Sequence, residues 1–436
     1  MGADGSRDAR RVALRVLGAC TRGQRLDRAL DTRAGALPPR DRHWVHALVY
    51  GVARLRGRLD YAIARHVHGG LERLEPTVLD LLRMGAYQLQ CMEGVPSYAA
   101  VSSTVELARA TGAGRAAGLI NAILRASARA GSLVDAFPGR ETDLEGHLTH
   151  WHSHPRWLVR RWLARWGAAA TEALVRHDNG VPGLFFRPVG VEVERALDRL
   201  RAGGMTAAAA GLGSGCLRLA GGTDPARVIG VVPGVIQDPG AALVARYAEP
   251  PPGALVADLC AAPGGKALVL SERAGYVLAT DLSPPRLKLV TASASRLGAR
   301  VGAVVADAGS APVRRADLVL VDAPCSGTGT LARRPDARWR LAETDPVSLA
   351  GIQSRLLAGA SRAVPAGGLL VYSTCTLEPE ENDEVVEGFL SQHPEFRLEA
   401  PEDMDSRVLD NRGHLRVLPQ STGFDGAFAA RMRRVG

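Results

Sequence analysis

The sequence predicts three folded parts in one chain: an all-α helical bundle, a small α+β module and a parallel, doubly wound α/β domain. Three observations support this prediction. Residues 1–135 show apolar side chains at three- and four-residue spacing, which is typical of amphipathic helices. Residues 150–250 mix strand-like and helix-like segments. In residues 251–436, short apolar strands alternate with helical stretches, as in a parallel sheet covered by helices.

The helical part, residues 1–135, contains a series of amphipathic segments. Asp41 is placed to cap a helix whose apolar residues recur at helical spacing. These residues are Trp44, Val45, Leu48, Val49, Val52 and Leu55. Pro76 stands where a helix can begin, and Pro96 precedes the helical segment SYAAVSSTVELARA. Because no strand-like alternation interrupts this region, we expect a helical bundle, followed by a linker over residues 131–150.

The middle part, residues 150–250, begins with PRWLVRRWLARWG, a segment rich in tryptophan and arginine. Two interpretations are open. The segment can be an amphipathic helix that packs Trp157 and Leu158 inward, or a helix whose arginine and aromatic side chains contact unpaired RNA bases. A strand at GLFFRPV, a helix at VEVERALDRLRAGG and a strand at GCLRLA follow. This succession indicates a small α+β module.

The last part, residues 251–436, contains apolar strand segments separated by helical stretches. The strand segments are ALVAD, YVLATD, VGAVVAD, ADLVLVD and GLLVYST. In a doubly wound parallel sheet, ligands bind in the crevice at the carboxyl ends of the strands. The residues that follow these strands are therefore the candidates for a binding site.

The net charge of +9 is distributed unevenly along the chain. Residues 1–250 carry 33 basic and 23 acidic side chains, whereas residues 251–436 carry 21 and 22. An excess of positive charge favours a polyanionic partner, and nucleic acid is the usual one. Of the 54 basic residues only Lys266 and Lys288 are lysines, a bias that we attribute mainly to coding composition.

Composition and cysteine spacing exclude several classes of protein. Hydrophobic residues make up 46% of the chain, which rules out a wholly disordered protein. No apolar run approaches the ~20 residues that span a bilayer, and the N-terminus lacks the apolar core of a secretory signal, so we expect a cytoplasmic protein with no membrane partner. The six cysteines form no C-x-x-C pair and no Cys/His cluster with zinc spacing. We therefore expect reduced thiols and no metal.

The first strand of the α/β part runs into a loop, DLCAAPGGK, and then into a helix. The loop residues are Cys260, Ala261, Ala262, Pro263, Gly264, Gly265 and Lys266. Cys260 and Ala267 stand where a phosphate-binding P-loop requires glycine and Ser or Thr, and the adjacent glycines do not form G-x-G-x-x-G. A glycine turn at this junction still lets the backbone approach a ligand closely.

Acidic residues close three successive strands beside this loop, and they are Asp258, Asp281 and Asp307. A carboxylate at the end of the second strand can accept hydrogen bonds from both hydroxyls of a ribose, and one at the end of the third can accept from an adenine amino group. S-adenosylmethionine carries a ribose and an adenine but no phosphate. It is therefore the cofactor that this set of residues predicts.

Two cysteines follow the next two strands. Cys325 lies in VDAPCSGTG after Asp322, and Cys375 lies in VYSTCT, so both should face the cofactor crevice. Methylation of a pyrimidine carbon needs such a thiol, because a thiolate that adds to C6 makes C5 of cytosine nucleophilic toward a methyl sulfonium. A base must then remove the C5 proton so that the thiol is eliminated. A carboxyl group such as Asp322 near N3 would help the ring accept electron density.

The motifs DLCAAPGGK, DAPCSGTG and YSTCT together resemble the Nop/Sun family of RNA (cytosine-5) methyltransferases. The segments VALRVL, LLRMGAYQL and VPSYAAVSSTVELAR are similar to the NusB-type RNA-binding domain, which is fused to the methyltransferase in the RsmB/Sun-type subfamily. The segment from HPRWLVRRWLARWG to VIQDPGAALVA resembles the ferredoxin-like module of that subfamily. The resemblance implies a Rossmann-like methyltransferase domain that methylates C5 of one cytosine in 16S ribosomal RNA.

The resemblance also implies roles for individual residues. Cys375 matches the nucleophile of the family, and Cys325 matches the second cysteine, which assists product release. The matching cofactor positions are Cys260 to Lys266, Asp281, Asp307 and Asp322. Asp322 can also contact the base. The chain departs from the family at Ala267, where threonine is usual, and at residues 186–189, where L-R-V-N is usual.

Two alternatives to this function stay open. One is a related methyltransferase that acts on transfer RNA, because the motifs do not reveal the position of the substrate base. The NusB-like region favours the ribosomal subfamily, with free RNA or a partly assembled small subunit as partner. The other alternative is an antitermination or assembly factor that binds RNA without catalysis. The presence of both Cys325 and Cys375 argues against it.

Overall fold

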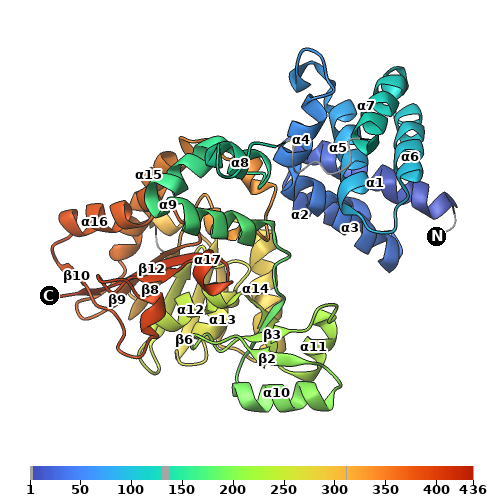
Figure 1. The fold of residues 1–436 in the computed structure, drawn as a ribbon. Helices are drawn as coiled ribbons and strands as arrows, with labels where there is room; N and C mark the ends of the chain where they lie inside the picture. The colour runs from blue at the N-terminus through green and yellow to red at the C-terminus, as the bar shows by residue number, and fades with distance from the viewer. Residues whose placement is uncertain (1–2, 130–136, 311, 436) are drawn as a thin grey trace. The chain divides into compact units, whose positions relative to one another are not determined.

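The structure is a computed structural model of the chain (Figure 1). It describes residues 3–129, 137–310 and 312–435. The chain forms two compact units, one made of residues 1–181 and 331–341 and the other of residues 182–330 and 342–436. Among the described helices, none combines the length and the apolar character that a membrane crossing requires.

The first unit is helical, as the sequence predicts. Its helices are α1 (Ala3–Thr21), α2 (Leu26–Ala34), α3 (Pro39–Arg54), α4 (Arg56–Ala64), α5 (Pro76–Cys91), α6 (Ser97–Ala110), α7 (Ala117–Arg129), α8 (Leu144–His150) and α9 (Arg156–Asn179). The prediction that Asp41 caps α3 is wrong, because Pro39 opens the helix earlier and places Asp41 in its first turn. The predicted linker over residues 131–150 contains α8, and its residues 131–136 lie outside the described residues.

The core of the helical bundle lies between α1, α3, α5, α6 and α7. Leu48, Leu81 and Ile120 are fully buried there, and burial of each such side chain contributes roughly 1.5–3 kcal/mol. Gly51 of α3 permits a close approach to α5, because a Cβ atom at this position would lie 2.0 Å from Cζ of Tyr87. A larger residue at position 51 would therefore require the ring of Tyr87 to move.

Helix α9 contains the tryptophan-rich segment. Leu158 and Trp162 are buried and Trp157 is half-buried, so the packing interpretation is confirmed for this face of the helix. Arg160 and Arg165 are exposed on the same helix. Contact of these arginines with RNA stays a prediction.

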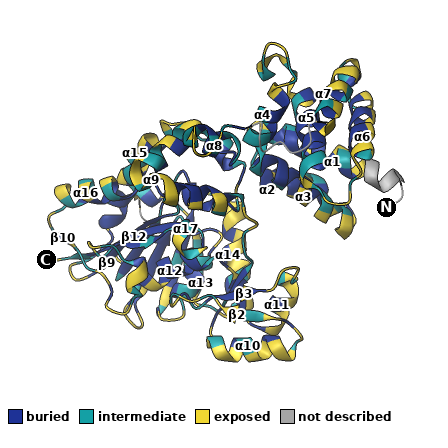
Figure 2. Ribbon diagram, in the orientation of Figure 1, coloured by how far each residue is buried: buried dark blue, intermediate teal, exposed yellow. Residues whose placement is uncertain are grey.

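The second unit begins with a small sheet that carries two helices. Its elements run β1 (Phe185–Pro188), α10 (Val193–Ala202), β2 (Ala207–Ala209), β3 (Leu217–Leu219), α11 (Pro225–Val231) and β4 (Gly234–Ile236). The strand order β2-β3-β1-β4, with antiparallel pairs throughout, makes this module ferredoxin-like. Its core holds Phe186, Leu200 and Leu217, whereas the outer face of α10 is exposed (Figure 2).

The rest of the second unit is a doubly wound α/β domain. Its strands are β5 (Leu255–Leu259), β6 (Tyr276–Asp281), β7 (Val301–Val305), β8 (Leu318–Asp322), β9 (Leu369–Thr374), β10 (Phe396–Leu398), β11 (Leu415–Val417) and β12 (Ala427–Arg434). Its helices are α12 (Pro239–Ala248), α13 (Gly265–Leu270), α14 (Pro284–Leu297), α15 (Asp345–Ser361), α16 (Asp383–Gln392) and α17 (Pro419–Thr422). The strand order is β10-β12-β9-β8-β5-β6-β7, with β11 beside β12. The neighbours from β9 to β7 are parallel, which confirms the predicted Rossmann-like domain.

The parallel strands are apolar along most of their length because hydrophobic clusters cover both faces of the sheet. In β8, Leu320 belongs to the cluster on one face, and Val319 and Val321 belong to the cluster on the other. The chain winds from β5 outward through β6 to β7, and then crosses to β8 and β9 on the other side of β5. The carboxyl ends of β5 and β8 therefore form the switch point at which such sheets bind ligands.

Residues 331–341, which follow the loop after β8, belong to the first unit. Arg338 of this segment is fully buried. It donates hydrogen bonds to the carbonyl oxygens of Ser153 at 3.1 Å and Asp178 at 3.0 Å, and to Oδ1 of Asn179 at 2.9 Å. Burial lowers the pKa of Arg338 to about 10, so the guanidinium stays charged at neutral pH.

Replacement of Arg338 by leucine should lower the free energy of unfolding of the first unit by about 3 kcal/mol, because the buried acceptors lose their charged donor. Urea unfolding followed by circular dichroism measures this loss. Arg334→Leu is the matched control, since Arg334 is exposed in the same segment and should change stability by less than about 0.5 kcal/mol. Equal unfolding curves for the two variants would contradict a stabilising role for Arg338.

Candidate active site

The carboxyl edge of the parallel sheet gathers the residues that the sequence singles out. Asp258 is the last residue but one of β5, Asp281 is the last residue of β6 and Asp322 is the last residue of β8. Cys375 directly follows β9, and Cys325 lies three residues after β8. Because these strands are parallel neighbours, their ends share one edge.

The loop CAAPGGK after β5 turns sharply and lies close to its neighbours. Cys260 and Gly264 have positive φ angles of 65° and 103°. A Cβ atom at Gly264 would lie 3.0 Å from Cγ1 of Val290, so both the backbone conformation and the space require glycine there. The backbone amide of Ala261 donates to the carbonyl of Thr280 at 2.7 Å, which ties the loop to β6.

Lys266 reaches from this loop to the end of β8. Its Nζ atom donates to Oδ2 of Asp322 at 2.6 Å, and Oδ1 of Asp322 accepts from Oγ of Ser373 at 2.9 Å. Burial acts to lower the pKa of Lys266, but the charge of Asp322 and its hydrogen bond outweigh this effect and raise the pKa above its usual value. The site therefore contains a fixed positive charge.

Asp258 is fully buried, and neither of its carboxyl oxygens has a hydrogen-bond partner among the described residues. Burial, reinforced by the negative charge of Asp322, raises the pKa of Asp258 to about 8. A buried polar group without a partner costs free energy, so these oxygens favour a ligand that donates hydrogen bonds or carries positive charge. Cys260 is a thiol, because burial and the same acids raise its pKa to about 12.

The two acids predicted to bind ribose and adenine have different surroundings. Asp281 accepts from the backbone amide of Ser283 at 2.9 Å and pairs with Nη1 of Arg286 at 3.2 Å. Asp307 is exposed and lies two residues beyond the end of β7, so the third strand ends earlier than predicted. Its Oδ1 atom accepts from the backbone amide of Gly309 at 2.9 Å. Binding of ribose and adenine by these acids stays a prediction.

The two cysteines contact each other. Their Sγ atoms are 3.4 Å apart, and the backbone amide of Cys375 donates to Sγ of Cys325 at 3.4 Å. The hydrogen bond with Cys375, together with burial, raises the pKa of Cys325 well above its usual value, which favours the protonated form of Cys325. The charge of Cys375 also raises the pKa of Lys266. Since this attraction is mutual, the ammonium of Lys266 stabilises a Cys375 thiolate.

A carboxylate that the sequence analysis does not single out lies beside the two cysteines. Glu381 accepts hydrogen bonds from Ser326 and Thr376, the residues that follow Cys325 and Cys375. It belongs to the acidic run EPEENDE, in which the letters alone do not show which member is buried. The only feature of the sequence that could have pointed to Glu381 is its position six residues after Cys375.

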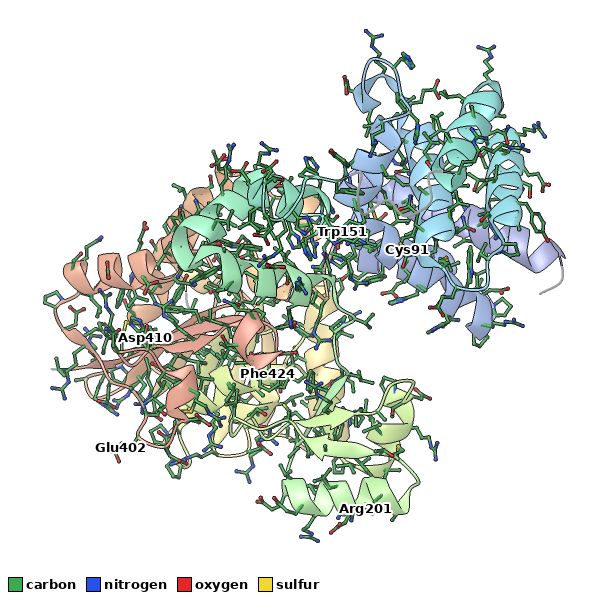
Figure 3. The ribbon with its side chains drawn as sticks, in the orientation of Figure 1. Cys91, Trp151, Arg201, Glu402, Asp410 and Phe424 are labelled. Carbon is green, nitrogen blue, oxygen red and sulfur yellow. The ribbon has the colours of Figure 1, made fainter. Side chains whose placement is uncertain are left out.

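A further group of potential metal ligands lies around Asp410, which Figure 3 labels. Ligand atoms of Asp383, Asp410 and His414 lie within 4.8 Å of one another. The guanidinium of Arg416 contacts both carboxylates, with its Nε atom 2.6 Å from Oδ2 of Asp410. We interpret this group as an ion-pair network that joins α16 to β11.

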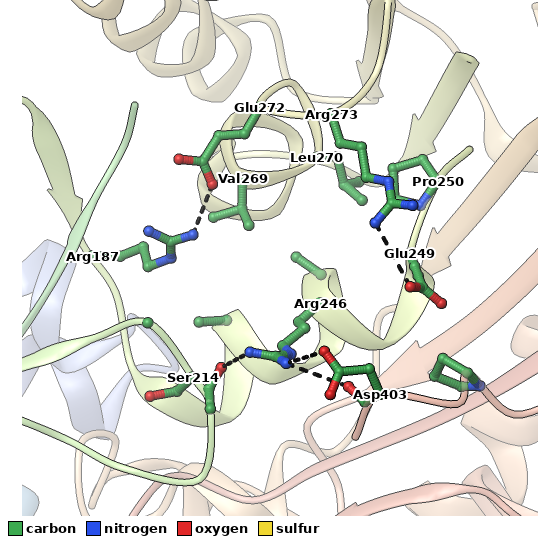
Figure 4. Close-up of a pocket in the computed structure, with 15 residues that line it drawn as sticks. Arg187, Ser214, Arg246, Glu249, Pro250, Val269, Leu270, Glu272, Arg273 and Asp403 are labelled. Atoms are coloured by element: carbon green, nitrogen blue, oxygen red, sulfur yellow. Dashed lines mark hydrogen bonds and ion pairs between the residues drawn. The ribbon is translucent and has the colours of Figure 1, made fainter. Parts of the chain in front are cut away.

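A cavity of about 300 Å³ lies between the ferredoxin-like module and the α/β domain (Figure 4). The ion pairs along its wall are Arg187–Glu272 at 2.7 Å, Arg246–Asp403 at 3.0 Å and Arg273–Glu249 at 3.7 Å. Glu249 precedes β5, and Arg273 precedes β6, so these residues lie at the amino ends of the strands. The cavity is therefore separate from the edge that carries the cysteines.

Comparisons with known proteins define the chain as a methyltransferase. Residues 245–433 match the family described as 16S rRNA methyltransferase RsmB/F, and residues 7–129 match the NusB family. The ribosomal RNA small subunit methyltransferase B of Thermus thermophilus is 36% identical over 98% of both chains. The Bacillus subtilis protein named "Probable ribosomal RNA small subunit methyltransferase B" is 34% identical over 93% of both chains. The chain therefore belongs to the RsmB/F family of 16S rRNA methyltransferases.

The fold is also found among solved structures. The crystal structure of a protein designated PH0851 matches with a TM-score of 0.80 and covers 98% of this chain and 99% of its own. Its sequence identity is 23%, so this likeness concerns the fold.

The pH dependence of stability should report the buried acid Asp258. Its pKa is raised to about 8 in the folded chain, whereas an unfolded aspartate titrates near ~3.9. Between these values the folded state holds the extra proton, so this residue makes the free energy of unfolding fall as pH rises, by up to about 1.4 kcal/mol per pH unit. Urea unfolding of the second unit at several pH values, compared between wild type and Asp258→Asn, should show a flatter dependence for the variant. If the free energies of unfolding of wild type and Asp258→Asn change with pH in the same way, Asp258 is not a buried neutral acid.

Proposed function

We propose that the protein transfers a methyl group from S-adenosylmethionine to C5 of a cytosine in 16S ribosomal RNA, through a covalent bond between Cys375 and C6 of the base. The observation that carries this proposal is the pair of thiols 3.4 Å apart at the carboxyl edge of the sheet. Lys266, whose ammonium favours a thiolate, stands beside them. Family membership supports methyl transfer to small-subunit ribosomal RNA.

The residues of the CAAPGGK loop fit the proposed cofactor. S-adenosylmethionine carries a sulfonium and an ammonium group, and the unpartnered oxygens of Asp258 favour a positively charged or hydrogen-bond-donating ligand. The positive φ angles of Cys260 and Gly264 fold this loop tightly at the carboxyl end of β5, where such sheets bind ligands. We assign the cofactor to the residues Cys260, Ala261, Ala262, Pro263, Gly264, Gly265, Lys266, Asp281, Asp307 and Asp322. The bound cofactor supplies an electrophilic methyl group.

Cys375 is the proposed nucleophile. Its thiolate adds to C6 of cytosine, and the electron pair of the C5–C6 double bond becomes available at C5 for the methyl group. Asp322 and Cys375 follow neighbouring strands, and Ser373 and Lys266 hold the Asp322 carboxylate in place. We place this side chain near N3 of the base, where its carboxyl group, when it carries a proton, can donate that proton to N3 and so help the ring accept electron density.

Release of the product requires two coupled events. A base removes the proton from C5, its electron pair restores the C5–C6 double bond, and the bond from C6 to sulfur breaks toward Cys375. Cys325 is the proposed holder of the proton between the two sulfurs, which are 3.4 Å apart, and the raised pKa of Cys325 supports this assignment. Its proposed role is to stabilise the departing Cys375 thiolate.

RNA capture is assigned to the parts of the chain that precede the catalytic domain. We propose a NusB-like RNA-binding domain over residues 1–135, a ferredoxin-like RNA-binding module over residues 150–250 and the methyltransferase domain over residues 251–436. The 33 basic and 23 acidic side chains of residues 1–250 support this division. A nearly neutral catalytic domain leaves most of the attraction for phosphate to the preceding parts.

Bisulfite sequencing of total RNA tests the function directly. In cells without the gene, one cytosine of 16S ribosomal RNA should lose its protection from conversion by bisulfite. A gene that carries Cys375→Ala should fail to restore this protection, because the nucleophile is absent. Cys91→Ala is the matched control, since this exposed cysteine lies on α5, and it should restore protection fully. If the Cys375→Ala gene restores protection, Cys375 is not the nucleophile. If the protection lost without the gene is that of a cytosine in transfer RNA, the transfer RNA methyltransferase is favoured instead.

Cys325→Ala should accumulate a covalent complex with RNA, because the departing thiolate loses its hydrogen-bond donor. We expect release to slow by at least ~100-fold, as for removal of a general acid or base. A denaturing gel with radiolabelled RNA and S-adenosylmethionine would show a shifted band. The double variant with Cys375→Ala should show none, and a band of equal strength in that variant would place the covalent bond elsewhere.

A further inference from the structure

The carboxylate of Glu381 joins the two loops that carry the cysteines. Glu381 ends a short 3₁₀ helix, Pro379–Glu381, and is fully buried. Among the described residues, no lysine or arginine pairs with it. A buried carboxylate of this kind is costly unless hydrogen bonds compensate for the loss of water.

Four hydrogen bonds reach the two carboxylate oxygens. Oε1 accepts from the backbone amide of Ser326 at 2.8 Å and from Nε2 of Gln353 at 3.0 Å. Oε2 accepts from Oγ1 of Thr376 at 2.9 Å and from the hydroxyl of Ser326. Ser326 directly follows Cys325, and Thr376 directly follows Cys375. One side chain is therefore bonded to both cysteine loops.

Other contacts fix the position of Glu381 and of the loops. The hydroxyl of Tyr372, in β9, donates to the carbonyl oxygen of Glu381 at 2.6 Å. Gln353 also donates to the carbonyl of Pro324, the residue before Cys325, at 2.9 Å. The loops have little freedom to move apart while these bonds persist.

The charge of Glu381 acts on the thiols as well. Burial raises the pKa of Glu381, and the hydrogen bonds from Ser326, Gln353 and Thr376 act in the opposite direction. Since all four contacts are donors, the ionised form satisfies them. Its negative charge is one of the causes that raise the pKa of Cys325.

We propose that Glu381 is a positioning residue, whose carboxylate holds the Cys325 and Cys375 loops in register. The expected effect of Glu381 on methyl transfer rests on the proposed function. Glu381 would act through the residues that follow the two cysteines, Ser326 and Thr376, to which it is hydrogen-bonded.

Glu381→Gln is the first test, because it removes the charge while keeping the shape. We expect kcat for methyl transfer to fall ~10–100-fold, the effect of a small misplacement of reacting groups, with KM for RNA and cofactor within about twofold of wild type. Glu384→Gln is the matched control, since Glu384 is exposed on α16 three residues further on, and it should leave kcat unchanged. A thermal melt within about 2 °C of wild type shows that each variant is folded.

A second measurement does not depend on methyl transfer. Diamide oxidises two adjacent thiols to a disulfide, and its N=N bond takes up the two electrons and two protons. In the wild type, the sulfurs 3.4 Å apart should close quickly into a Cys325–Cys375 disulfide, which peptide mass spectrometry detects. Glu381→Gln should slow this closure at least ~10-fold, because the loops lose their common anchor. Glu384→Gln should not.

Ser326→Ala keeps the inference testable if Glu381→Gln does not fold. This variant removes one donor to Oε2 of Glu381 but leaves the hydrogen bond from the backbone amide to Oε1. The kcat for methyl transfer and the rate of disulfide closure should therefore both fall, by a smaller factor than in Glu381→Gln. Unchanged kcat and unchanged disulfide closure in the folded variants would overturn the inference. Slow closure in the Glu381 variants, together with a wild type that methylates no cytosine of 16S ribosomal RNA, would support the inference and refute the proposed function.

Discussion

Parallel pairing of β9, β8, β5, β6 and β7 is the constraint on which the site depends. Parallel strands all end at the same edge, so each βα loop is delivered to one side of the sheet. Asp258 and Cys375 are 117 positions apart in the sequence, and the parallel pairing brings both to the carboxyl edge of the sheet. The hydrophobic clusters on both faces of the sheet hold that edge rigid, because neither face can be exposed to water without loss of burial.

The electrostatics of the site are asymmetric around the two sulfurs. The ammonium of Lys266 favours the thiolate of Cys375, whereas the carboxylate of Glu381 favours the protonated form of Cys325. The surroundings thus act on two identical side chains in opposite directions, which is the kind of asymmetry that a nucleophile and a neighbouring proton donor would need. Asp322 is held by Lys266 and Ser373, so the position of its carboxylate at the sheet edge is also fixed.

Much of the fold could be predicted because local patterns record it. Apolar runs mark the parallel strands, and the residues after them mark the edge where Cys325 and Cys375 meet. Short helix α8 has too few residues for a clear period, so its segment was predicted to be a linker. The burial of Glu381 within an acidic run, and the missing partners of Asp258, depend on neighbours distant in the sequence, which no local pattern records.

The segment of residues 331–341 bears on the modularity of the protein. The match to the methyltransferase family begins at residue 245, yet Arg338, inside that match, finds its acceptors in Ser153 and Asn179, the latter 159 positions earlier in the chain. A fragment cut at the family boundary would keep the guanidinium and discard the carbonyl groups that bind it. The sequence that matches the methyltransferase family therefore includes a segment that packs within the helical unit.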